Sequence, residues 1–311
     1  LGGSVAEGLT TLSDIGFMLA TQIRGNETLN SKYKRVRIFN AALGGMKQPQ
    51  GLQTYQALSM LDHDFDLIIE LSGFNEIALN IVENYRNQIH PIYPRLSSHQ
   101  SLKAAHQLTR PYWLHILDNL LWAHPFHQYL VNNTQIYSLS RIIFKQGFER
   151  RMSSQRLGMN ISLPASENDA VEKSISIYKK STQILYTISN KSRAQYLLVI
   201  QPNQHLSGSK PLTLEEQGYS ILTNKFLNFI YPLFKFKPRA FYTAKIIEKY
   251  YSRIEPESFD IPRNNILDLR MLFINTNSTM YSDSCCHLNK QGMETISGKI
   301  VDRSLNLLSD I

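Results

Sequence analysis

The first eight residues of the chain set a serine among glycines. They read Leu-Gly-Gly-Ser-Val-Ala-Glu-Gly, and Ser4 stands where a helical pattern begins. Glycines allow the sharp backbone turn that holds a hydroxyl clear of its neighbours, as a nucleophile requires. Ser4 is therefore a candidate nucleophile.

Partners for such a serine lie near the other end of the chain. Residues 283–289 read Asp-Ser-Cys-Cys-His-Leu-Asn, which places a carboxylate four residues before a histidine. His287 could act as a base on the serine hydroxyl, and Asp283 could orient the imidazole ring. Together the three residue types predict nucleophilic catalysis by Ser4.

The two cysteines offer an alternative nucleophile. Cys285 and Cys286 directly precede His287, but no second histidine has a recognisable partner, and Ser4 already occupies the expected turn. A disulfide between neighbours is strained, so the pair is not a disulfide framework. Neither CxxC nor HExxH spacing occurs, and we expect no metal and no cofactor.

The composition is that of a globular protein. The 311 residues are 42% hydrophobic with 16 Tyr and 14 Phe, and the length suits one α/β domain, residues 1–311, that carries an insertion. The net charge of +8 falls partly in short basic clusters at 32–37, 150–151, 179–180 and 235–237, without a nucleic-acid-binding signature. We interpret them as solvated surface and expect no nucleic-acid partner.

The first part of the chain alternates helical and strand patterns. Apolar spacing predicts a helix over 6–24 and a strand over 35–43 that is broken by the glycine pair at 44–45. A second helix is expected over 49–61 and a second strand over 65–72. This succession is typical of βαβ units, which form a parallel sheet.

Residues from about 77 to 190 carry little strand signal and predict a helical insertion or cap. Aromatic residues between 112 and 129 could line an apolar substrate cleft, although aromatic residues on helices more often pack in the core.

The sheet pattern returns after the insertion. A nearly all-apolar run predicts a strand over 194–200 that is buried on both faces, and 266–269 predicts a short last strand. Helices are expected from residue 213 and over 289–308. We therefore expect a three-layer α/β/α, flavodoxin-like sandwich with a mainly parallel sheet.

Two glutamines follow the predicted strand at 194–200. Gln201 and Gln204 stand where it ends, the edge at which open α/β sheets bind ligands, and their amides could bind substrate hydroxyls. A turn closed by Pro202 and Asn203 explains the same residues equally well.

The chain opens without a methionine and directly on the serine motif, which suggests an N-terminal truncation. We expect an apolar strand immediately upstream of Leu1. A signal peptide or membrane anchor would also lie there, and membrane association is expected only through such a segment. No apolar run in the chain reaches the ~18 residues that a spanning helix needs.

The chemistry-bearing residues fall into four short blocks whose order resembles the SGNH (GDSL-like) hydrolase superfamily. The blocks are Gly2-Gly3-Ser4, Gly44-Gly45, Gly73-Phe74-Asn75-Glu76 in place of GxND, and Asp283 with His287. They are spread over nearly the whole chain. In that family the serine attacks an acyl carbonyl, and three donors hold the oxyanion: the serine N–H, the glycine N–H and the asparagine side chain. The resemblance assigns these roles to Ser4, Gly45 and Asn75, with Gly44 as the alternative to Gly45.

The chain departs from the family pattern at two positions. Glu76 stands where an aspartate is usual, which should do no harm because Asn75 makes the expected contact. The last block usually reads DxxH, whereas here Ser284 lies three residues before His287 and Asp283 lies four before it. A loop longer by one residue can still bring the carboxylate to the ring.

The resemblance implies hydrolysis of a carboxylic ester, such as an O-acetyl ester, through an acyl-serine intermediate. The expected partner is a small-molecule or glycan ester. An O-acyltransferase of envelope glycans and a non-catalytic carbohydrate-binding relative are the alternatives. An α/β-hydrolase, suggested by Gly2-Gly3-Ser4-Val5-Ala6, is disfavoured because its nucleophile follows several strands and its acid and histidine normally sit on separate loops.

Overall fold

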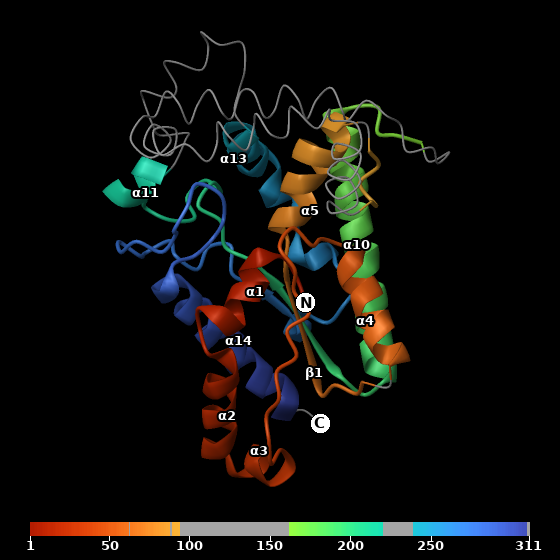
Figure 1. Ribbon diagram of the computed structural model, residues 1–311, viewed down its shortest axis with the longest axis vertical. Helices are drawn as coiled ribbons and strands as arrows, with labels where there is room; N and C mark the ends of the chain where they lie inside the picture. Colours follow the sequence, from red (N-terminus) through yellow and green to blue (C-terminus); the bar gives the residue numbers. More distant parts are fainter. Residues whose placement is uncertain (62, 88, 94–161, 220–238, 310–311) are drawn as a thin grey trace, which may run out of the picture.

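A computed structural model describes the chain at residues 1–61, 63–87, 89–93, 162–219 and 239–309. Within these residues the architecture is mixed α/β, with helices around a small parallel sheet (Figure 1). The aromatic residues between 112 and 129, and with them the middle of the predicted insertion, lie outside the described residues.

In the described residues the sheet has three strands, in the order β1-β2-β3. They are β1 (Leu67–Ser72), β2 (Gln195–Ile200) and β3 (Ile266–Asp268). Both pairings are parallel, with Leu67 opposite Gln195 and Leu198 opposite Ile266. All three strands fall where the apolar runs predict them, so these expectations are confirmed.

The predicted strand over 35–43 is wrong. These residues are all described and have no regular secondary structure, and a turn follows at 44–45. A backbone hydrogen bond from the Leu43 N–H to the Gly2 carbonyl oxygen (3.1 Å) links this segment to the chain beside β1. A strand needs a hydrogen-bonded neighbour along its length, and none of the described residues forms such a ladder with 35–42.

The single helix expected over 6–24 is two helices, α1 (Ser4–Thr11) and α2 (Ile15–Gly25). Asp14 caps α2, since its side chain accepts a hydrogen bond from the Phe17 N–H at 2.9 Å. Ser13 is buried at the break, where its hydroxyl lies 2.6 Å from that of Ser297. Polar partners for the new helix end explain why the chain breaks within a continuous apolar pattern.

The other helices complete the described part of the chain. They are α3 (Glu27–Lys32), α4 (Gln50–Met60), α5 (Phe74–Leu79), α10 (Glu167–Lys191), α11 (Leu214–Tyr219), α13 (Arg239–Tyr250) and α14 (Lys290–Ser309). A π-helical turn spans Asn80–Asn84, and 3-10 turns span Tyr85–Asn87, Tyr251–Arg253, Pro256–Ser258 and Arg263–Asn265. The helices expected at 49–61, from 213 and at 289–308 correspond to α4, α11 and α14.

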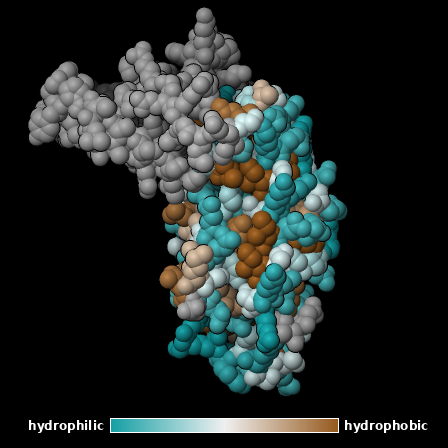
Figure 2. All heavy atoms as spheres, turned by 90° about the vertical axis from the view of Figure 1, so that its right-hand side faces the viewer, coloured by the Kyte–Doolittle hydropathy of each residue, from teal (hydrophilic) through white to brown (hydrophobic). Residues whose placement is uncertain are grey.

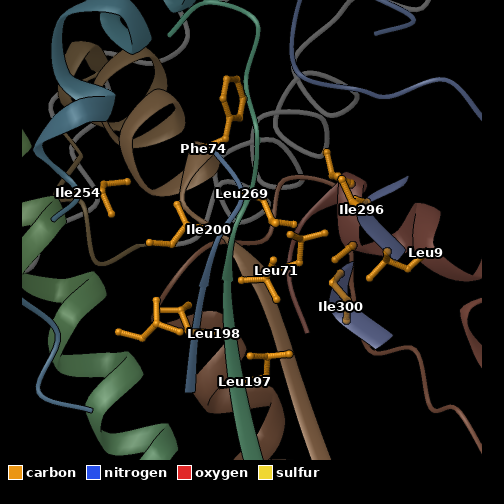
Figure 3. Packing of buried hydrophobic residues seen from close by; sticks show 14 of the residues in the cluster. Leu9, Leu71, Phe74, Leu197, Leu198, Ile200, Ile254, Leu269, Ile296 and Ile300 are labelled. Atoms are coloured by element: carbon orange, nitrogen blue, oxygen red, sulfur yellow. The ribbon is translucent and has the colours of Figure 1, made fainter. Parts of the chain in front are cut away.

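Helices lie on both sides of the strands. In Figure 1, α1, α2 and α14 lie to one side of β1, and α4 and α10 lie to the other. Leu198 and Ile200 of β2 are fully buried between them, as is Ile300 of α14 (Figure 3). Tyr178 and Leu185 of α10 are also fully buried in this cluster, so the end of the predicted insertion packs in the main core.

The face that carries α4 and α10 is largely hydrophilic, with hydrophobic side chains between the polar ones (Figure 2). Exposed hydrophobic residues in this part of the chain include Met60, Leu61 and Ile184. Such a surface is expected of helices that bury one stripe and hydrate the other.

Candidate active site

Ser4 is the first residue of α1, and the backbone before it leaves room only for glycines at positions 2 and 3. Leu71 of β1 donates its N–H to the Leu1 carbonyl oxygen at 3.0 Å, so the chain enters beside β1. Gly2 has a φ of +138°, and a Cβ there would lie 2.1 Å from the Leu71 carbonyl oxygen. A side chain at this position would push the serine turn away from the sheet.

Asn75 lies against the residue that precedes the nucleophile. A Cβ on Gly3 would lie 2.1 Å from Asn75 Nδ2, so the asparagine amide fills the space beside the serine turn. The same Nδ2 donates to the Met46 carbonyl oxygen at 2.7 Å. Met46 follows Gly45, which is buried with a φ of +82°. The structure thus brings the first three sequence blocks together.

Glu76 joins the glycine loop to the start of α5. Its Oε2 accepts a hydrogen bond from the Gly73 N–H at 2.7 Å, and its Oε1 accepts one from the Gln48 N–H at 3.0 Å. Burial, together with the nearby Glu70, raises the pKa of Glu76 to about 7. The sequence predicts only that Glu76 is a harmless replacement for aspartate, and it does not predict this role. An acid three residues after a glycine at a helix start was the available signal.

Lys47 is a second buried charge beside this loop. Its Nζ donates to the Pro91 carbonyl oxygen, and only 2% of the residue is exposed. Burial lowers the pKa of Lys47 to about 7, although Glu76 acts in the opposite direction. A small cavity next to both residues is lined by Gly2, Met46, Lys47, Gln48, Gly51, Glu70, Ser72 and Glu76.

The loop before α14 brings His287 to Ser4. Ser4 Oγ and His287 Nε2 are 2.7 Å apart across 283 positions of sequence. On the other side of the ring, Nδ1 is hydrogen-bonded to Asp283 Oδ2. Because a carboxylate only accepts, Nδ1 carries the proton, and Nε2 accepts from the serine hydroxyl. General-base activation of a serine requires this arrangement.

Asp283 is held by the backbone of its own loop. Its Oδ1 accepts hydrogen bonds from the N–H groups of Cys285 (2.9 Å), Cys286 (3.2 Å) and His287 (3.2 Å). Burial alone would raise the pKa of Asp283, but hydrogen bonds from the His287 ring and the Cys285 N–H outweigh it and lower the pKa. The bond to Asp283 raises the pKa of His287 against the effect of burial. The four-residue spacing therefore still places the carboxylate on the ring.

Cys285 and Cys286 lie on the loop between Asp283 and His287. Their Sγ atoms lie 3.5 Å apart and are not joined by a disulfide, with Cys285 half-buried and Cys286 buried. The contact with Cys285 and burial raise the pKa of Cys286 well above its ordinary value, which keeps it a thiol. His287 Nε2 contacts the serine hydroxyl, so this geometry favours a serine nucleophile over a cysteine.

The glutamines expected to bind substrate lie beneath the surface. Gln201 is 5% exposed and Gln204 is 6% exposed. Gln204 Nε2 donates to the Asp283 carbonyl oxygen at 2.6 Å, so this amide contacts the loop of the acid. Asn203 and His205 contact the same loop, and the sequence does not predict these contacts. The run of hydrogen-bonding side chains directly after β2 was the signal.

Neither metal ligands nor a membrane-crossing helix is found in the described ranges. There, no three His, Cys, Asp or Glu residues gather as a metal ion would require. None of the helices described for this chain is both long enough and apolar enough to cross a bilayer.

Comparison with models of known protein families gives no match to this chain, and comparison with curated proteins gives none either.

Proposed function

We propose that this chain is a serine hydrolase that cleaves a carboxylic ester through an acyl-serine intermediate. One observation carries the proposal: Ser4 Oγ lies 2.7 Å from His287 Nε2, while Nδ1 of the same ring is bonded to Asp283. A serine, a base and an orienting acid in this geometry define acyl-transfer chemistry on unrelated folds.

The proposed reaction has two stages. In the first, Ser4 Oγ attacks the acyl carbonyl, His287 Nε2 takes the hydroxyl proton, and the same nitrogen returns it to the departing alcohol. In the second, water attacks the acyl-serine, His287 takes the water proton and then gives it to Ser4 Oγ. Asp283 stabilises the imidazolium in both stages, in agreement with the raised pKa of His287.

The oxyanion would be held by the N–H groups of Ser4 and Gly45 and by Asn75 Nδ2, with Gly44 as the alternative glycine. Asn75 supports this role because it lies against Gly3 and uses one of its two amide protons on the Met46 carbonyl. The second proton is left for the substrate. Preorganised donors of this kind stabilise the tetrahedral intermediate.

We also propose an SGNH-type hydrolase with a three-layer, flavodoxin-like sandwich. The order of the four blocks along the chain, the parallel sheet and the helices on both sides of it support this proposal (Figure 1). The substrate class that goes with it is a small-molecule or glycan ester.

A fluorophosphonate probe followed by peptide mapping tests the nucleophile and its position together. We expect one labelled peptide, which contains Ser4, and no labelling in Ser4→Ala. Ser31→Ala, which removes an exposed hydroxyl on α3, is the matched control and should label normally. On a panel of acetyl and longer acyl esters, Ser4→Ala should lower kcat/KM by at least about 1,000-fold. Ester cleavage that survives in Ser4→Ala would refute the proposal.

A further inference from the structure

The loop that carries Asp283 and His287 depends on hydrogen bonds for its shape. Its N–H groups at 285–287 converge on Asp283 Oδ1. The carbonyl groups of residues 283–285 are partly buried, and a carbonyl that is withdrawn from water without a partner costs free energy.

Three consecutive side chains meet these three carbonyls. Gln204 Nε2 donates to the Asp283 oxygen at 2.6 Å, His205 Nε2 to the Ser284 oxygen at 2.8 Å, and Asn203 Nδ2 to the Cys285 oxygen at 3.3 Å. Asn203 is fully buried, and the other two donors are 6% exposed. Water therefore has little access to replace them.

The donors are themselves fixed to the central strand. They follow β2 directly, and the Gln201 N–H continues the ladder by donating to the Ser72 carbonyl oxygen at 3.1 Å. Asn203 Oδ1 accepts the His205 N–H at 2.8 Å, and Ser209 Oγ donates to the Asn203 carbonyl oxygen at 2.8 Å. The three side chains therefore present a rigid set of donors.

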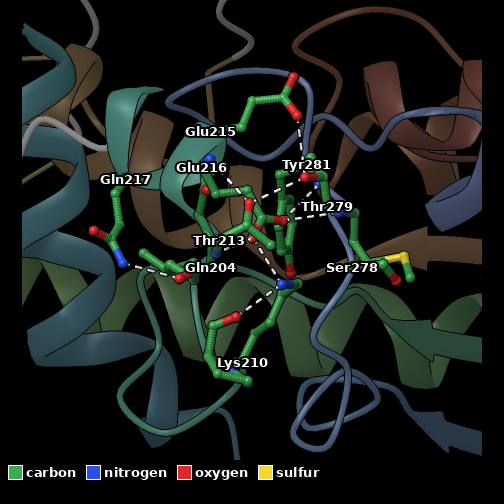
Figure 4. A network of polar contacts seen from close by, with 12 residues as sticks. Gln204, Lys210, Thr213, Glu215, Glu216, Gln217, Ser278, Thr279 and Tyr281 are labelled. Carbon is green, nitrogen blue, oxygen red and sulfur yellow. Dashed lines mark hydrogen bonds and ion pairs between the residues drawn. The ribbon is translucent and has the colours of Figure 1, made fainter.

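The start of the loop has a separate anchor. Glu216 Oε1 accepts the N–H groups of Met280 (2.8 Å) and Tyr281 (3.1 Å), and its Oε2 accepts from Lys210 Nζ at 2.7 Å (Figure 4). This anchor ends at residue 281, before the acid. Within the loop, the Ser282 N–H donates to the His287 carbonyl oxygen at 3.0 Å and Asp283 Oδ1 accepts three N–H groups, so the donors from 203–205 add to bonds that the loop makes with itself.

We propose that Asn203, Gln204 and His205 form a carbonyl clamp that positions Asp283 and His287 to activate Ser4. This inference rests on the proposed function and deepens it. The acid and the base are separated by one residue more than in the DxxH pattern, which adds two rotatable backbone torsions to the loop. Three bonds to consecutive carbonyls remove that freedom, so that the carboxylate meets Nδ1 in one orientation.

The matched pair His205→Phe and His205→Gln tests the clamp. Phenylalanine keeps a ring without a donor, whereas glutamine keeps an N–H near the position of Nε2. We expect His205→Phe to lower kcat by about 10- to 100-fold with KM nearly unchanged, since a small misplacement of catalytic groups costs rate. His205→Gln should restore most of that loss.

The same His205 substitution made in the Asp283→Asn variant shows whether His205 acts through Asp283. In Asp283→Asn, where the acid no longer orients the ring, His205→Phe should add no further loss. Asn265→Ala is the control for a general structural effect. Asn265 is a buried amide that donates to the Tyr196 carbonyl oxygen at 2.6 Å, at the far end of β2. Its variant should lower the thermal midpoint and leave kcat unchanged.

One readout is independent of turnover. The His287 Nδ1 proton, bonded to a carboxylate, should give a strongly deshielded NMR signal in the wild type and in His205→Gln, and a weaker or shifted one in His205→Phe. Equal kcat and equal signals in the two His205 variants would overturn the clamp, as would an equal loss of kcat in Asn265→Ala. If the wild type neither cleaves esters nor reacts with the fluorophosphonate, the proposed function fails, and the NMR signal still decides the clamp.

Discussion

The two halves of the candidate site are positioned by different forces. The serine half is positioned by close packing. A Cβ at Gly2 would lie 2.1 Å from the Leu71 carbonyl oxygen, and a Cβ at Gly3 would lie 2.1 Å from Asn75 Nδ2. The histidine half is positioned by hydrogen bonds, three to Asp283 Oδ1 and three to the carbonyls of its loop. Close packing tolerates no added atom, whereas one hydrogen bond contributes only about 1 kcal/mol. Damage should therefore be abrupt in the serine half and graded in the clamp.

Asp283→Asn should have the largest effect, because Asp283 is bonded both to the His287 ring and to three N–H groups of its loop. An amide can present its NH₂ to Nδ1 and favour the wrong tautomer, so kcat should fall by about 10⁴-fold. The pH profile supplies a second measure. His287 must be neutral to act, so wild-type kcat/KM should rise with pH through a pKa raised by Asp283. In Asp283→Asn that rise should move to lower pH; an unmoved rise would contradict the assignment of the acid.

Gly3→Ala tests the steric half. The added Cβ must displace the Asn75 amide, and loss of one oxyanion donor typically lowers kcat by about 100- to 1,000-fold. Gly25→Ala, at a glycine with nothing within 4 Å of the added Cβ, is the matched control and should behave as wild type. The measurement is kcat of the wild type and both variants on one ester. A Gly3→Ala enzyme with wild-type kcat would show that the contact between Gly3 and Asn75 has no catalytic role.

Glu76→Gln tests whether the serine half also depends on the carboxylate of Glu76. Glutamine has one acceptor oxygen, so either the Gly73 N–H or the Gln48 N–H loses its partner, and kcat should fall about tenfold. In the wild type, protonation of Glu76 below its pKa of about 7 should add to protonation of His287 and steepen the acid limb of the rate profile. The variant should show the shallower slope of one proton, and equal slopes in the two proteins would argue against this role.

Lys47→Met should have the smallest effect on rate and a visible effect on stability. The pKa of Lys47 is lowered to about 7 in the folded protein. Between that value and the ordinary 10.5 the unfolded chain binds the extra proton, so stability should rise with pH by up to about 1.4 kcal/mol per unit. Below pH 7 both states hold the proton, and the contribution is flat. Urea titrations across pH 7 to 10 should show a steeper rise in stability with pH for the wild type than for the variant.

The sequence was sufficient where a pattern is local. The apolar runs locate the three strands of the described residues, because a buried parallel strand needs little besides hydrophobic side chains. The strand expected at 35–43 fails for the opposite reason: its apolar residues are present, but no described neighbour pairs along it. The break between α1 and α2 at Asp14 is not predicted, because the capping by Asp14 overrides a helical period of apolar residues that continues across the break.

For the candidate site, the catalytic residues were easier to predict than the residues that hold them in place. Ser4, Asp283 and His287 are conspicuous because few residue types perform that chemistry, and the structure places their side chains in contact. The contacts of Glu76 with Gln48 and of His205 with Ser284 join distant segments through single bonds. Nothing in a local pattern specifies such partners, since they depend on how the strands bring their loops together.

The 283 positions between Ser4 and its base have a consequence for how the protein is made. The ribosome synthesises Ser4 long before His287, so the growing chain carries an unactivated hydroxyl while the 283 residues up to the base are added. Reactivity would begin only when the segment leading into α14 docks beside α1. A serine-directed probe would then label Ser4 only in chains that have completed this docking step. Nascent chains, and chains shortened so that they lack His287, would not be labelled.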